Sequence, residues 1–188
     1  QLARALTSPA GLVAMSVTLA LAVVGAIFAA RFMLGPDVAA LTAKLRPDQL
    51  VVIAADDATV SGPGGKQPAE AGTVLSPGQL IETGTGSVLL RNRLGNNLRL
   101  ARASRIALAG QQEDATAGKR LVFRTPKGDL RLDFRQDENF EVICGQRSVV
   151  GERAQLRWST EGGIAVVRVQ TGQARMRAQD ALGPIAYP

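Results

Sequence analysis

Three pairs of neighbouring carboxylates and one thiol are the side chains of this chain that could do chemistry. Two adjacent carboxylates can act as an acid–base couple or can bind calcium. All three pairs fall in predicted turns, where acidic side chains commonly serve the turn itself, and we favour that interpretation. The candidates are Asp56 with Asp57, Glu113 with Asp114, Asp137 with Glu138, and Cys144.

The absence of histidine removes most other catalytic options. The 188 residues contain no His and one Cys. This composition excludes Ser–His and Cys–His nucleophile pairs, imidazole metal ligands, an intrachain disulfide and a CxxC metal cluster. Cys144 shares a face of a predicted strand with Phe140 and Val142, so we expect a small core residue. The sequence therefore predicts a protein that is not an enzyme, with no cofactor and no metal ion.

Two glycine-rich segments resemble nucleotide-binding loops only superficially. Residues 61–66 lack the GxxxxGK(S/T) spacing, and no helical pattern follows them. Residues 83–87 lack the third glycine of the dinucleotide fingerprint and lie between predicted strands. We expect neither segment to bind a nucleotide.

Short strands are the elements that must position these side chains. Apolar and polar residues alternate, as where Leu130, Leu132 and Phe134 share one face, or Val167 and Val169 share another. Turn residues recur about every 8–12 residues, which is typical of an all-β domain. A short helix over 38–45 and a loop over 61–72 accompany strands predicted at 49–54, 79–82, 87–93, 97–101, 105–109, 120–124, 129–135, 139–143, 154–159, 164–170 and 173–177.

Basic residues occur on most of the predicted strands. The net charge is +6, from 22 Lys and Arg against 16 Asp and Glu. We interpret the basic residues as the solvated outer face of a sheet. Nucleic-acid binding is disfavoured because Trp158 and Tyr187 are the only aromatic residues besides phenylalanine. The basic residues are Arg91, Arg93, Arg99, Arg102, Arg131, Arg135, Arg157, Arg168, Arg175 and Arg177.

Residues 7–30 contain no charged residue and predict a membrane segment. A bilayer core of about 30 Å needs roughly 20 helical residues. A secretory signal peptide is the alternative, but its apolar core is only about 7–15 residues long. We therefore predict a single transmembrane helix over 9–34. Its lysine and arginine flanks do not decide the orientation.

Small residues recur along one face of this predicted helix. Such a face lets two helices pack closely in lipid, although alanine is simply abundant in this segment, and both interpretations stay open. The predicted helix–helix interface is Ala14, Thr18, Ala22, Gly25, Ala26, Ala29 and Ala30.

The ordered motifs of residues 71–178 resemble the FecR domain, a periplasmic β module of bacteria. Residues 75–87 resemble the family phrase L-x-x-G-D-x-I-x-T-G-x-x-S, and residues 94–108, 140–142, 151–156 and 167–174 resemble the phrases that follow. Asn96 and Asn97 replace the family's D-G-S turn, and Glu152 stands where the family usually has Thr. The matching positions, which serve turns and packing, are Gly78, Ile81, Thr83, Gly84, Ser87, Leu98, Leu100, Ser104, Phe140, Val142, Val167, Val169 and Gly172.

This resemblance implies an all-β, FecR-like fold, a short-strand β-sandwich or β-solenoid-like domain, behind one N-terminal transmembrane helix. It also implies a bacterial inner-membrane protein whose C-terminal domain is periplasmic. The expected organisation is a short cytoplasmic tail at 1–8, the transmembrane helix at 9–34, a linker with a short helix and the first strand at 35–70, the FecR-like domain at 71–178 and a C-terminal tail at 179–188.

Three functions are compatible with this organisation. The first is a non-enzymatic accessory or scaffolding subunit of an envelope complex. Its helix would contact an integral membrane protein and its β domain a periplasmic protein. The second is a transmembrane signal transducer of the anti-sigma type, which requires a cytoplasmic segment upstream of Gln1. The third is binding of an anionic envelope polymer by the basic sheet faces. No nucleic-acid partner is expected.

Overall fold

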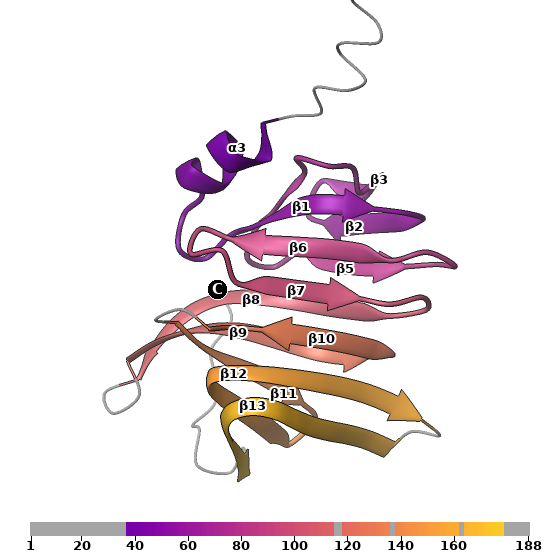
Figure 1. The fold of residues 1–188 in the computed structure, drawn as a ribbon. Helices are drawn as coiled ribbons and strands as arrows, with labels where there is room; N and C mark the ends of the chain where they lie inside the picture. The colour runs from indigo at the N-terminus through magenta and orange to yellow at the C-terminus, as the bar shows by residue number, and fades with distance from the viewer. Residues whose placement is uncertain (1–36, 115–117, 136–137, 162–163, 179–188) are drawn as a thin grey trace, which may run out of the picture. The chain divides into compact units, whose positions relative to one another are not determined.

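The structure, a computed structural model, describes residues 37–114, 118–135, 138–161 and 164–178. These residues form one short helix followed by strands (Figure 1). The elements are α3 (Val38–Lys44), β1 (Leu50–Ala55), β2 (Ala58–Gly62), β3 (Gly65–Pro68), β4 (Val74–Leu75), β5 (Leu80–Thr83), β6 (Val88–Asn92), β7 (Asn97–Leu100), β8 (Arg105–Asp114), β9 (Gly118–Lys127), β10 (Asp129–Asp133), β11 (Asn139–Cys144), β12 (Arg147–Glu161) and β13 (Ile164–Ala178).

All thirteen described strands belong to a single, strongly curled mixed sheet. Its strand order is β3-β2-β5-β8-β9-β11-β12-β10-β7-β6-β1-β4, and β13 pairs with β12 beside this path. We call β2 to β11 along this path the first arm and β12 to β1 the second arm. The pairing of β9 with β11 is parallel, and the other described pairings are antiparallel.

Strand β12 joins the two arms. Its residues 147–151 pair with β11, and its residues 155–159 pair with β10. The register shifts between Glu152 and Gln155, where Arg153 has a positive φ of 46°. An irregularity of this kind bends a strand and increases its twist. One long strand can therefore leave the first arm and enter the second.

The inner faces of both arms enclose one apolar core. Alternation along the strands supplies it, as in β10, where Leu130 and Leu132 are fully buried. Three phenylalanines lie at its centre. The ring of Phe134 meets Phe123 edge-on at 6.2 Å between centroids and meets Phe140 at 4.8 Å. The predicted shared face of Leu130, Leu132 and Phe134 is confirmed.

A buried ion pair lies within the first arm, beside this core. Arg120 of β9 and Glu141 of β11 approach to 2.7 Å between Nε and Oε2. Both side chains are almost completely shielded from solvent, with 4% and 0% exposed. Burying two charges is costly unless they are held together. The contact therefore fixes how the two parallel strands lie against each other.

The prediction of an all-β domain is confirmed for the described residues, and so is the short helix. Three details are wrong. The loop expected at 61–72 overlaps the β2–β3 hairpin, because the glycines of the hairpin turn lie between two short strands. The strand predicted at 154–159 is part of the longer β12. The two strands predicted at 164–170 and 173–177 are one strand, β13, because Gly172 (φ 80°) lies inside it, opposite the irregularity of β12, and does not end it.

Candidate functional site

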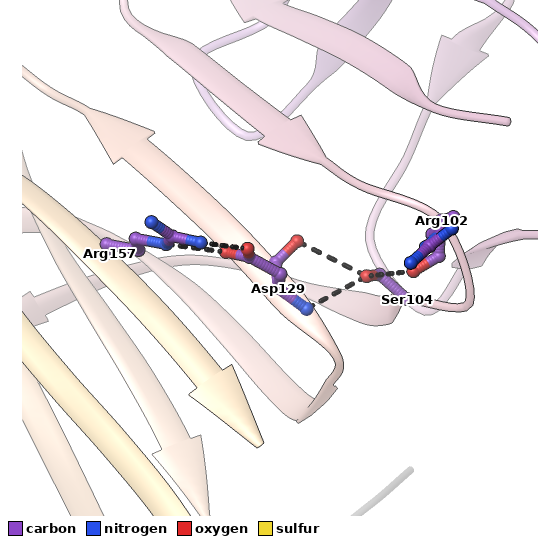
Figure 2. A network of polar contacts seen from close by, with 4 residues as sticks. All are labelled: Arg102, Ser104, Asp129 and Arg157. Carbon is purple, nitrogen blue, oxygen red and sulfur yellow. Dashed lines mark hydrogen bonds and ion pairs between the residues drawn. The ribbon is translucent and has the colours of Figure 1, made fainter. Parts of the chain in front are cut away.

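Two turns meet at one end of the sheet and form a polar network (Figure 2). The hydroxyl of Ser104, which follows β7, accepts a hydrogen bond from the backbone N–H of Asp129 at 3.0 Å. The same hydroxyl lies 3.1 Å from the carbonyl oxygen of Arg102. Gly128 (φ 84°) brings the second turn against Ser104 so closely that a Cβ would overlap the serine side chain. The two turns are therefore locked together.

Asp129 extends this network to the next strand. Its two carboxylate oxygens accept from Nε and Nη2 of Arg157 at 3.1 and 2.5 Å. About half of the Arg157 side chain is exposed, so the pair contributes little to stability. Its effect is positional, because a two-point contact fixes the plane of the guanidinium. Figure 2 shows Asp129 between Arg157 and Ser104.

Two depressions flank this network. The first has a volume of about 540 Å³ and the second about 850 Å³. Arg102, Asp129 and Arg157 line both of them. Asp129 is the only carboxylate among the residues that line the second depression. Three further cations and two hydroxyls line it as well, namely Arg105, Lys127, Arg168, Ser159 and Thr160.

Four arginines cross the second arm in a single row, which we call the arginine row. Arg131 of β10 lies directly opposite Arg99 of β7 on one side and Arg157 of β12 on the other. Arg157 in turn lies opposite Arg168 of β13. All four side chains are exposed on the outer face. The sequence interpretation of a solvated outer face is thus correct about exposure, but it did not foresee that four basic residues share one register.

The far edge of the second arm is β13. Among the described strands, β13 pairs only with β12. Val169 and Met176 stand opposite the buried Leu156 and Val149, so they continue the core-facing side of the sheet, yet they are 46% and 68% exposed. The predicted apolar face of β13 is therefore covered only in part, with Val167 packed against the core.

The three carboxylate pairs have different surroundings. Asp56 and Asp57 lie in the β1–β2 turn, as predicted, and two hydrogen bonds from Thr85 lower the pKa of the Asp57 carboxyl. Glu113 and Asp114 lie in β8, so the turn predicted for them is wrong.

Glu138 lies in the connection between β10 and β11, where a turn was predicted, but its side chain is buried and not at the surface. Its carboxylate accepts a hydrogen bond from Nδ2 of Asn92. Asp137 lies outside the described residues.

Cys144 is partly buried against the core, as predicted. In the described part of the chain, no three Asp, Glu, His or Cys side chains cluster in a way that could hold a metal ion.

Glu138 gives the fold a pH-dependent element. Burial raises the pKa of its carboxyl, although hydrogen bonds from Asn96 and Asn92 and the charge of Arg93 oppose that rise. The folded state therefore keeps this proton to higher pH than the unfolded chain. Its contribution to stability is fully present below the ordinary glutamate pKa of about 4.3 and is lost as pH rises through the raised value.

We expect Glu138→Gln to remove this pH dependence, because the amide does not titrate and still offers an oxygen to Asn92. Urea unfolding followed between about pH 4 and about pH 7 measures the effect. Glu70→Gln, at an exposed position, is the matched control. Equal pH dependence in the Glu138→Gln variant and the unmodified protein would contradict the assignment.

The positions that carry the FecR resemblance build the core and the turns. Five of them are fully buried core residues, namely Ile81, Leu98, Leu100, Phe140 and Val142. Gly78 (φ 83°) and Gly172 have positive φ, and Gly84 and Ser87 flank the turn at Asp56 and Asp57 through backbone hydrogen bonds. The structure brings Thr83 and Ser104 together, since the Thr83 hydroxyl accepts from the Ser104 N–H at 3.0 Å.

The predicted transmembrane helix and its small-residue face lie outside the described residues, and so do both predicted tails. Among the residues that are described, no helix is both long and apolar enough to span a bilayer.

Comparison with known proteins adds no relative: no family model, no curated protein and no solved structure matches the chain. The functional argument therefore rests on the fold, the surface chemistry and the sequence itself.

Proposed function

We propose that this chain is a non-enzymatic interaction protein whose β domain binds an extended segment of a partner protein along β13. The observation that carries this proposal is the outer edge of that strand, with which no further described strand pairs. Fifteen residues, Ile164–Ala178, form β13, and the described strands offer it one neighbour only. A long unpaired edge exposes backbone N–H and C=O groups that readily accept a further strand.

The exposed apolar side chains of β13 favour binding of a protein strand at this edge. Natural edge strands are usually short, twisted or charged on the apolar side, which discourages pairing. Here Val169 and Met176 remain exposed on the core-facing side, and Ile164 and Val166 are exposed as well. An added strand would cover Val169 and Met176 with alternate apolar residues of its own.

Charge indicates what kind of strand would bind. The sequence of β13 contains Arg168, Arg175 and Arg177 and no Asp or Glu. A second copy of the chain would bring the same three cations to the interface. A partner segment that alternates apolar with acidic residues complements both the charge and the apolar side chains.

The wider setting of the protein rests on the sequence. The uncharged residues 7–30 support a membrane anchor, and the resemblance to the FecR domain supports display in the bacterial periplasm. Together they favour an accessory or scaffolding subunit of an inner-membrane or envelope complex. A signal transducer of the anti-sigma type is the alternative, and a cytoplasmic segment upstream of Gln1 in the native protein distinguishes it.

Site-specific photo-crosslinking tests the β13 proposal. A photoreactive residue in place of Val166 is expected to give one major protein adduct in the native cells, whose crosslinked peptide carries acidic residues. The same residue in place of Gln67, on the exposed edge strand β3, is the matched control. Met176→Lys is expected to weaken the adduct at least about tenfold, because a charge on the apolar edge opposes strand addition. Equal adducts from both positions, or an adduct with a second copy, would refute the proposal.

The anchor is tested separately. If the predicted small-residue face packs against an integral membrane protein, Ala22→Leu with Ala26→Leu should lower recovery of that protein in a mild-detergent pull-down. The β13 adduct is expected to survive these changes, so the two interactions can fail independently.

A further inference from the structure

We infer that the arginine row is a binding site for a linear phosphate polymer, which lies across the strands on the outer face of the second arm. The row is formed by Arg99, Arg131, Arg157 and Arg168, one from each of four neighbouring strands. Neighbouring strands lie about 4.8 Å apart, so the row is about 14 Å long. The row shares Arg168 with the β13 edge, and its other three arginines lie on other strands.

Only one of the four arginines in the row, Arg157, has a carboxylate partner among the described residues. Arg131 is flanked on its own strand by Asp129 and Asp133. Arg157 holds Asp129, and Arg135 holds Asp133 at 2.7 Å. Among the described residues, no ion pair is made by the side chains of Arg99, Arg131 or Arg168.

Such an arrangement costs stability in the unliganded protein. Like charges placed directly opposite each other on neighbouring strands are destabilising. In this row three such oppositions follow one another, and Asp129 eases the two that involve Arg157 but not the one between Arg99 and Arg131. An anion that bridges adjacent guanidiniums would turn each repulsive contact into an attractive one.

The surroundings of the row supply further donors. The depression at one side is lined by Thr85, Ser87 and Arg102, and the depression at the other side by Lys127, Ser159 and Thr160. Asp56 and Asp129 are the carboxylates among all these lining residues. Hydroxyls and guanidinium forks together match the oxygens of phosphate groups.

The same surroundings argue against other anions. No aromatic residue lines either depression, whereas proteins that bind single-stranded nucleic acid use aromatic side chains to stack bases. An acidic peptide added to the sheet would run parallel to the strands, and its same-face side chains repeat at about 6.6 Å. The row runs perpendicular to the strands with a shorter repeat. A flexible chain of phosphates fits this direction and spacing.

Binding of inorganic polyphosphate to the full chain in an uncharged detergent tests the site. We expect Arg99→Gln with Arg131→Gln to weaken binding at least about tenfold. The slope of log affinity against log salt should fall by about 0.7 for each phosphate group that the variant no longer neutralises. The matched control is Lys119→Gln with Arg147→Gln, which removes two exposed cations outside the row. This control is expected to bind as the unmodified protein does.

Thermal unfolding distinguishes loss of the site from loss of the fold. Without ligand, the Arg99→Gln, Arg131→Gln variant is expected to unfold at no lower temperature than the control, because it loses two opposed charges. Polyphosphate should raise the midpoint of the control by clearly more than that of the row variant at the same polyphosphate concentration. Equal binding by both variants, absence of binding to the unmodified protein, or equal affinity for polyglutamate would overturn the assignment.

Discussion

Glu141→Ala is expected to lower the free energy of unfolding by about 3–5 kcal/mol. The substitution leaves the buried guanidinium of Arg120 without the carboxylate that approaches it to 2.7 Å, in surroundings that water cannot reach. Because a domain of this size is stable by only about 5–15 kcal/mol, much of its stability would be lost. Urea unfolding of the full chain measures the change.

Two further variants make this prediction specific. Replacing both partners, Arg120→Met with Glu141→Leu, should recover most of the loss, because an apolar pair carries no desolvation cost. Asp48→Ala breaks the exposed pair with Arg46 and should cost no more than about 1 kcal/mol. If Glu141→Ala costs no more than Asp48→Ala, the buried pair does not hold β9 and β11 together.

Phe134→Ala is expected to cost about 3–5 kcal/mol as well, for a different reason. The Phe134 ring touches Phe123 and Phe140, and its removal leaves a cavity between the two arms. Phe134→Leu should cost clearly less, because it refills part of that space.

The exposed Met176 supplies the control for this cavity. Met176→Ala should change the free energy of unfolding by no more than about 0.5 kcal/mol, since surface substitutions rarely exceed that. Equal losses from Phe134→Ala and Met176→Ala would show that the three phenylalanines do not form the centre of the core.

The sequence predicted those parts of the fold that depend on local alternation. Leu130, Leu132 and Phe134 alternate with charged residues, so their shared buried face could be assigned before the structure was known. The continuity of β13 at Gly172 could not be assigned, because a glycine with positive φ ends a strand in one setting and lies within a continuous strand in another. Glu138 could not either, because its burial depends on Asn92, which is 46 residues away in the chain.

The candidate site could be predicted from the sequence only in part, for the same reason. Each arginine of the row was recognisable as an exposed residue on a strand. Their common register depends on three strand pairings, and two of them join strands that are not consecutive in the chain. The alternation within one strand does not show which residue of the next strand lies opposite. The row could therefore be recognised only once the strand pairings were known.

Strand β13 lies at the far end of the second arm from β1. From β1, which follows the N-terminal part of the chain, the arm passes through β6, β7, β10 and β12 to β13. Five steps of about 4.8 Å make the path from β1 to β13 about 24 Å long, measured along the curled sheet. The backbone hydrogen bonds between antiparallel strands lie along that same line. A partner that pulls β13 away from β1 would therefore load these hydrogen bonds along their own direction.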